Sequence, residues 1–190
     1  LHILSCDEPA LPESESPRTA PDAWWEQHEP LFHCAFPRRT RLGVSIDRAV
    51  PDASICPHKL TRCVLNLLTN AGRAIGARLE QLPNGGVVTV AVRSGESGGR
   101  RVVRVSVSDN GIGMTPEVMR RATEAFFTTR NGGRGLGLGL ALVSRVAEEQ
   151  GGRLEIESEP GVGTTMTMVL PACEVNTLRA CTDASAARGA

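Results

Sequence analysis

Residues 109–143 are unusually rich in glycine, and this limits what the chain can fold into. The stretch begins Asp109-Asn110-Gly111-Ile112-Gly113 and ends Gly135-Leu136-Gly137-Leu138-Gly139-Leu140-Ala141-Leu142-Val143. Glycine has no β-carbon and tolerates positive φ, so such loops bring backbone amides close to a ligand. The last glycines lead into an apolar run that continues to Gly151 and predicts a helix. Unpaired N–H groups and the dipole meet at a helix N-terminus, so we expect an anion such as a phosphate to bind there.

The charges of the chain are balanced. Its 190 residues include 21 basic and 21 acidic side chains, for a formal net charge of zero. No block of like charge stands out, so we expect no nucleic-acid partner and no direct membrane contact. The only lysine, Lys59, follows Pro57-His58. It belongs to neither a Walker-type loop nor a protein-kinase strand, and this excludes both lysine-dependent phosphate sites.

The six cysteines are scattered without a Cys-x-x-Cys pair, so the spacing of zinc ligands is absent. We expect free thiols in a reducing compartment. The sequence shows no signal peptide, and no apolar run approaches the roughly 20 residues that span a bilayer. These features predict a soluble, cytoplasmic chain and are compatible with the cytoplasmic part of a longer, membrane-bound sensor.

Hydrophobic periodicity predicts a two-layer α/β (α+β) sandwich, with a mixed, mostly antiparallel sheet and helices on one face. The predicted helices are residues 22–29, ended by Pro30, and residues 57–81, 116–125 and 138–150. The predicted strands are residues 41–47, 87–93, 101–108, 154–157 and 164–170, with a loose hairpin tip at 94–99. The predicted domain covers residues 22–171. Residues 1–21 resemble a linker that starts with the end of a preceding helix, and residues 172–190 resemble a disordered tail.

One face of the longest predicted helix is polar. Asn66, Asn70 and Arg73 recur at helical spacing and share that face. An apolar stripe made of Leu60, Val64, Leu67, Leu68, Ala71, Ala74 and Ile75 occupies another face. Asn has a low helix propensity and needs partners when buried, so this face indicates a polar site. A solvated helix face is the alternative.

Four segments resemble, in order and spacing, the motifs of the GHKL superfamily. Asn66-Leu67-Leu68-Thr69-Asn70-Ala71 is similar to the N box, and residues 109–113 are similar to the first glycine box. Phe126-Phe127-Thr128-Thr129-Arg130 is similar to the F box, and residues 135–143 to the second glycine box. The last two motifs are typical of sensor histidine kinases of two-component systems. The resemblance covers residues 22–171 and implies the Bergerat fold, with ATP and Mg²⁺ as cofactors.

The resemblance implies a role for each matching position. Asp109 would accept a hydrogen bond from the adenine amine, which favours adenine over guanine. Asn70 would bind Mg²⁺ with support from Asn66, and Arg73 would face the terminal phosphate. The other expected nucleotide contacts are Gly111, Ile112, Gly113, Met114, Phe127, Thr128, Thr129, Arg134, Gly135, Leu136, Gly137, Leu138, Gly139 and Thr164, whereas Leu140 is expected in the core.

Residues 128–134 would form a lid over the triphosphate. Arg130 and Arg134 would neutralise phosphate charge there, or alternatively would be solvated loop residues. Hydrolytic members of the superfamily carry a Glu one turn before the metal-binding Asn, where this chain has Asn66. An amide cannot act as a general base, so we expect poor hydrolysis and transfer of the γ-phosphoryl group to another nucleophile.

The nucleophile that the resemblance implies is a His on a dimerisation domain outside this chain. Among the four His, only His28 is followed by an acidic residue, and Pro30 would break the required helix. The expected partners are that histidine-containing domain, on the same parent chain or in trans, and through it a response regulator. A homodimer would form through the same domain. The alternatives are a clamp-type ATPase, a degenerate nucleotide-binding module and a protein-serine kinase.

Overall fold

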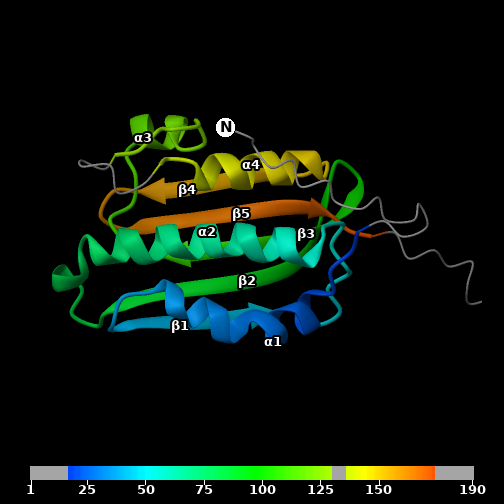
Figure 1. Ribbon diagram of the computed structural model, residues 1–190, viewed down its shortest axis with the longest axis horizontal. Helices are drawn as coiled ribbons and strands as arrows, with labels where there is room; N and C mark the ends of the chain where they lie inside the picture. The colour runs from blue at the N-terminus through cyan, green and yellow to red at the C-terminus, as the bar shows by residue number, and fades with distance from the viewer. Residues whose placement is uncertain (1–16, 130–135, 174–190) are drawn as a thin grey trace, which may run out of the picture.

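The computed structural model describes residues 17–129 and 136–173, which form a five-stranded sheet with helices packed on one face (Figure 1). The strand order is β1-β2-β3-β5-β4. β1 and β2 are parallel, and the other three neighbouring pairs are antiparallel. The predicted two-layer fold with a mixed, mostly antiparallel sheet is therefore confirmed.

The elements follow the predicted order along the chain. The strands are β1 (Thr40–Ile46), β2 (Gly86–Ser97), β3 (Arg100–Asp109), β4 (Arg153–Glu159) and β5 (Gly163–Pro171). The α-helices are α1 (Pro21–Phe32), α2 (Pro57–Gly76), α3 (Pro116–Arg121) and α4 (Gly139–Glu149), and the 3-10 helices are η1 (His33–Ala35) and η2 (Leu79–Gln81). None of these helices is long and apolar enough to cross a bilayer.

The core lies between the sheet and helices α1, α2 and α4, which cover the same face in Figure 1. Burial alternates along β2, where Val88, Val90 and Val92 are fully buried. The predicted apolar stripe of α2 packs onto these valines, and only Ala74 of the stripe stays partly exposed. Because this stripe faces the sheet, the Asn66 and Asn70 face of α2 is left for other contacts.

The predicted end of the first helix at Pro30 is wrong, since α1 continues to Phe32. Trp24, Trp25 and Phe32 form an aromatic cluster with ring centroids 5.1 to 6.1 Å apart, and Phe32 is fully buried. Trp24 Nε1 also donates to Thr61 Oγ1 of α2 at 2.9 Å. Pro30 removes only one backbone donor near the helix end, and burial of the aromatic rings outweighs that loss.

The hairpin between β2 and β3 is tighter than predicted. Instead of a loose tip over residues 94–99, the ladder continues to the pair Ser97–Arg100. Gly98 and Gly99 make the turn with φ of +59° and +73°. Two successive positive φ angles suit the right-handed twist of a hairpin and favour glycine at both positions.

Two predicted helices are longer than those observed. α2 ends at Gly76 instead of near Gln81 and continues as a turn and η2, while α3 ends at Arg121 instead of Ala125. The predicted cap of α3 is present, because Thr115 accepts a hydrogen bond from the Val118 amide.

Both flanks of the predicted domain meet at Ala53. Thr19 is buried and forms a β-bridge with Ala53, which also bridges to Ala172. The Cys173 amide donates to the Asp52 carbonyl at 2.7 Å. Ala172 and Cys173 are thus packed and hydrogen-bonded, although the tail was predicted to begin at Ala172. The rest of the predicted tail and the predicted helix end in residues 1–5 lie outside the described residues.

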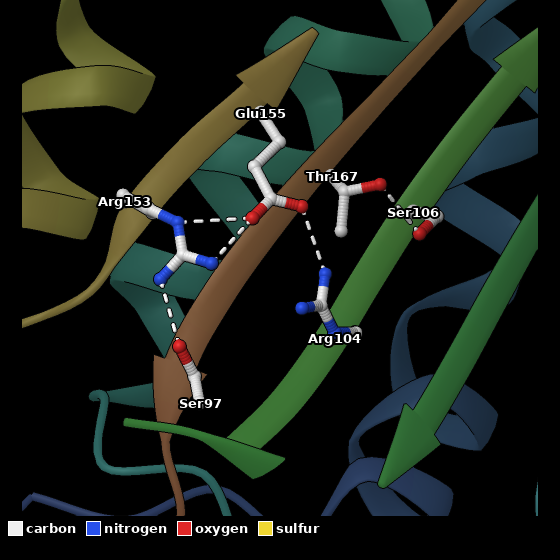
Figure 2. Close-up of polar contacts among 6 residues, drawn as sticks. All are labelled: Ser97, Arg104, Ser106, Arg153, Glu155 and Thr167. Atoms are coloured by element: carbon white, nitrogen blue, oxygen red, sulfur yellow. Dashed lines mark hydrogen bonds and ion pairs between the residues drawn. The ribbon is translucent and has the colours of Figure 1, made fainter. Parts of the chain in front are cut away.

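The opposite face of the sheet carries paired polar side chains (Figure 2). Arg104 Nη1 donates to Glu155 Oε2 at 2.8 Å, and Arg153 Nε donates to Glu155 Oε1 at 2.9 Å. The hydroxyl groups of Ser106 and Thr167 lie 2.8 Å apart across β3 and β5. Such cross-strand pairs suit a face of the sheet that contacts water.

Candidate nucleotide site

Asp109 is the last residue of β3, and its carboxylate is held by its surroundings. Oδ1 accepts a hydrogen bond from the Gly111 amide at 2.8 Å, and Asp109 faces Thr164 in the β3–β5 ladder. Burial raises the pKa of Asp109 from 3.8 to about 6, while backbone hydrogen bonds from Gly111 and Thr164 oppose this rise. A carboxylate accepts up to about four hydrogen bonds, so capacity remains for a donor from a ligand.

The first glycine box lies against two other segments with very little space. A β-carbon on Gly111 would stand 2.5 Å from the backbone of Ala74 in α2, and one on Gly113 would stand 1.9 Å from the Glu159 carbonyl oxygen. The Ile112 amide donates to the Ala74 carbonyl at 3.2 Å, and the Gly161 amide donates to the Ile112 carbonyl at 2.8 Å. The loop is thus fixed between the end of α2 and the turn that joins β4 to β5.

Side chains that the sequence did not single out complete this junction. Ser158 Oγ accepts from the Met114 amide at 2.8 Å, donates to the Gly163 carbonyl at 3.0 Å and lies 2.8 Å from Thr164 Oγ1. Arg78 Nη1 donates to the carbonyls of Gly111, at 3.1 Å, and Gly161. Ser158 faces Thr164 in the β4–β5 ladder, so correct strand pairing could have identified it. Nothing in the sequence pattern points to Arg78.

The polar face of α2 meets the start of α4. Asn66 and Asn70 are partly buried, whereas Arg73 is exposed. Asn66 Nδ2 donates to the Arg62 carbonyl at 2.8 Å, and Asn66 Oδ1 lies 3.0 Å from the place that a Gly139 β-carbon would take. The structure thus brings the predicted N box beside the second glycine box.

The N-terminus of α4 has no side-chain cap among the described residues. Its first amides therefore have no partner within the helix. They form the positive end of the helix dipole, which favours an anion. Just before it, Gly137 has a φ of +65°, and a β-carbon there would stand 2.4 Å from the Phe127 carbonyl oxygen. The Phe126 amide donates to the Gly137 carbonyl at 3.1 Å, so the F box is fastened to the second glycine box.

The structure describes the predicted lid only in part. The Arg121 guanidinium lies 4.2 Å from the centroid of the Phe127 ring, and Thr128 and Thr129 are exposed. Leu136 and Leu138 are also exposed. The predicted contacts Arg130, Arg134 and Gly135 lie outside the described residues.

The predicted apolar contacts differ in their surroundings. Ile112 is exposed on the first glycine box, where its side chain is open to a ligand. Met114 and Leu140 are partly buried and pack against the core. For Leu140 this agrees with the predicted place in the core.

Among residues 17–129 and 136–173, no group of three or more His, Cys, Asp or Glu is placed to hold a metal ion. Asn70 carries a neutral amide oxygen and is partly buried on the face of α2 that also bears Asn66. Mg²⁺ retains several waters and commonly binds through substrate phosphates with few protein ligands. The residues present therefore fit a Mg²⁺ ion that arrives with a nucleotide.

The fold, the glycine loops and the Asn-bearing helix together are those of a nucleotide-binding domain. Residues 56–174 match the family described as "Histidine kinase-, DNA gyrase B-, and HSP90-like ATPase", and the chain belongs to this family. The predicted membership of the GHKL superfamily is thereby confirmed.

The chain is similar to kinases from several bacteria. It is 44% identical over 115 residues to the sensor histidine kinase ZraS of Klebsiella oxytoca, covering 60% of this chain and 22% of that protein. It is 34% identical over 122 residues to sporulation kinase E of Bacillus subtilis (strain 168), covering 64% of this chain and 15% of that protein. The chain thus spans less than a quarter of the length of these two relatives.

Solved structures share the fold. The mycobacterial sensor histidine kinase MprB aligns with a TM-score of 0.65 at 24% identity, covering 82% of this chain and 97% of that one. Full-length ShkA in complex with AMPPNP aligns with a TM-score of 0.65 at 24% identity, covering 86% of this chain and 33% of that one. The chain therefore shares the fold of the aligned parts of these two proteins.

Proposed function

We propose that this chain is the ATP-binding catalytic domain of a sensor histidine kinase, which binds Mg·ATP and transfers its γ-phosphoryl group to a histidine. The observation that carries the proposal is the course of α2 between the two glycine boxes. Asn66 lies beside Gly139 of the second box, and Ala74 contacts Gly111 of the first. Asn70 lies midway, on the same helix face. Eight residues of helix span about 12 Å, a length suited to an extended nucleoside triphosphate.

The base would bind at the Ala74 end of this helix face. Asp109 would accept a hydrogen bond from the adenine amine, and the backbone of Gly111 and Gly113, packed against Ala74 and Glu159, would turn beneath the ring. Ile112, Met114 and Thr164 would line the base. Because Asp109 is already held by the Gly111 amide, little reorganisation would accompany binding.

The phosphates would bind at the Asn66 end. The uncapped start of α4 would offer its amides to the phosphate oxygens. Gly137 and Gly139 let this segment pack closely against Phe127 and Asn66. Phe127, Thr128, Thr129, Leu136 and Leu138 would flank them, with Arg130, Arg134 and Gly135 completing the lid. Asn70 would hold Mg²⁺, which when bound neutralises phosphate charge. Arg73 is exposed beside Ala74, so its side chain would have to extend along the helix face to reach the terminal phosphate.

The site favours transfer over hydrolysis. Asn66 occupies the place of a water-activating Glu, and its Nδ2 donates to the Arg62 carbonyl. An amide held in this way has no basic group to take a proton from water. The acceptor would be a histidine-containing dimerisation domain of the parent protein, which would pass the phosphoryl group to a response regulator. We place this activity in the cytoplasm, with residues 22–171 as the catalytic domain.

The test combines the chain with γ-labelled ATP, Mg²⁺ and the separately produced histidine-containing domain of its parent protein. We expect base-stable, acid-labile label on that domain and little phosphate release when it is left out. Sustained ATP turnover without an acceptor would favour a clamp-type ATPase. Tight ATP binding without any labelling would favour a degenerate binding module.

A further inference from the structure

Arg78 joins two segments that are far apart in the sequence. It lies two residues after α2, and its Nη1 donates to the Gly111 carbonyl at 3.1 Å and to the Gly161 carbonyl. Gly111 follows β3, and Gly161 lies in the turn between β4 and β5. A single guanidinium nitrogen therefore fixes the distance between these two loops.

The same glycine that Arg78 holds also holds Asp109. The Gly111 carbonyl accepts from Arg78, while the Gly111 amide donates to Asp109 Oδ1 at 2.8 Å. A β-carbon on Gly111 would lie 2.5 Å from the Ala74 backbone, so the residue has little room to shift toward α2. Arg78, Asp109 and Ala74 together therefore set the orientation of Gly111. Among the hydrogen bonds of the described residues, only Arg78 donates a side-chain N–H to the Gly111 carbonyl.

Arg78 has few other interactions that could explain its position. Its Nε is buried without a hydrogen-bond partner among the described residues, and no ion pair involving it is found there. Buried hydrogen-bond donors usually have a partner, so the unpaired Nε of Arg78 lowers the stability of the fold. Of its two side-chain hydrogen bonds within the described residues, one goes to Gly111 in the loop that carries Asp109, and the other goes to Gly161, whose amide donates to Ile112 of that loop.

We propose that Arg78 is a positioning residue for base recognition: by holding the carbonyls of Gly111 and Gly161 together, it orients the Gly111 amide and through it the Asp109 carboxylate toward the adenine amine. This inference rests on the proposed function, because it concerns how the same site selects its nucleotide. It predicts that Arg78 affects selectivity for the adenine amine more than affinity for the triphosphate.

The test compares ATP with purine riboside triphosphate, which lacks the amine, as ligands of the whole chain in calorimetry with Mg²⁺. Arg78→Met keeps the stem of the side chain but removes every donor. We expect it to weaken ATP binding by about tenfold, the scale of one lost hydrogen bond, and to change binding of the analogue much less. Arg78→Lys keeps donors and should restore most of the preference for ATP.

Arg93→Met is the matched control, because Arg93 lies on the open face of the sheet and pairs with Asp47. It should leave both affinities unchanged. If Arg78→Met does not fold, as judged by circular dichroism, the shorter Arg78→Leu, which also lacks a hydrogen-bond donor, gives the same readout.

Two results would overturn the inference. An unchanged preference for ATP in Arg78→Met, or equal weakening of both ligands, would show that Arg78 does not act through Asp109. In that case the proposed function would stand, since the unmodified chain still binds ATP. If the unmodified chain bound neither nucleotide, the proposed function itself would fall, and this inference with it.

Discussion

Gly113 lies so close to Glu159 that a β-carbon on it would stand 1.9 Å from the Glu159 carbonyl oxygen. The first glycine box and the end of β4 thus meet backbone against backbone. Gly113 also has a φ of +67°, which side-chain-bearing residues rarely adopt. Any other residue at this position would have to move the loop that carries Asp109.

Gly113→Ala should therefore destabilise the fold and weaken ATP binding by about tenfold or more, since the loop must shift to relieve the overlap. Gly98→Ala is a matched control, because Gly98 has a φ of +59° and no atom within 4 Å of its β-carbon position. The control should cost only the left-handed backbone penalty, about 1 kcal/mol, and leave ATP binding unchanged. Denaturant unfolding and calorimetry measure the two effects. Equal losses in both variants would contradict a specific contact at Gly113.

Asp109→Asn should weaken ATP binding by about 1–3 kcal/mol, the usual scale for an unpaired buried polar group. The Gly111 amide donates to Asp109 Oδ1 and would require the single oxygen of Asn. The Asn amide nitrogen would then point a donor at the adenine amine. Purine riboside triphosphate, which has no amine, should bind both proteins nearly equally. An unchanged affinity of Asp109→Asn for ATP would remove Asp109 from the base site.

The raised pKa of Asp109 predicts opposite pH effects on folding and on binding. Burial raises its pKa from 3.8 to about 6, so between these values the folded chain binds a proton that the unfolded chain has released. The free energy of unfolding should therefore fall as pH rises from about 4 to 6, by up to about 3 kcal/mol. ATP affinity should rise over the same range, because the ionised carboxylate is the better acceptor.

Asp109→Asn provides the comparison for both pH effects. Titration of the nucleotide phosphates and of other carboxylates, such as Glu155 with its lowered pKa, is common to both proteins. Subtracting the pH profile of the variant from that of the unmodified chain isolates the contribution of Asp109. Parallel profiles from pH 4 to pH 7 would show that Asp109 does not titrate in this window.

Local sequence signals predicted those parts of the fold that local physics determines. Alternating valines gave β2 and β3, and the apolar stripe beginning at Leu60 gave α2 with its buried face. The prediction failed where tertiary contacts decided the outcome. Pro30 locally disfavours a helix, but α1 continues to Phe32 because the Phe32 side chain is buried in the core. The turn at Gly98 and Gly99 could be assigned only after the register of the two strands was known.

In the candidate site, too, local sequence signals led to some residues and tertiary contacts brought in others. The motif residues were predicted because their order and spacing resemble those of the GHKL boxes. Arg78 was missed because its partners are 33 and 83 residues away in the sequence, and a single arginine after a helix has no periodic signal. Ser158 was missed because only the pairing of β4 with β5 brings it to Thr164. Contacts between distant segments are not encoded in local spacing.

Glu155 should contribute little to stability despite its two arginine partners. Burial raises its pKa, but the hydrogen bonds and charges of Arg104 and Arg153 outweigh burial and give a lowered value. Arg104 and Glu155 are each about a third exposed, at 34%, so solvent screens their attraction. A double-mutant cycle with Glu155→Gln and Arg104→Met should give a coupling of about 0.2–1 kcal/mol. The coupling should vanish as pH falls below 4.5, the ordinary pKa of the group. A coupling of several kcal/mol would contradict this account.

Asn70→Ala should abolish the part of ATP affinity that depends on Mg²⁺. Asn70 lies on α2 midway between the contacts with Gly111 and Gly139, where the phosphates and their metal would be expected. No acidic cluster among the described residues could replace its amide oxygen. Calorimetry with and without Mg²⁺ should therefore show a difference in the unmodified chain and none in the variant. Asn84→Ala, in the exposed turn before β2, is the control and should keep the difference. An intact Mg²⁺ effect in Asn70→Ala would place the metal elsewhere.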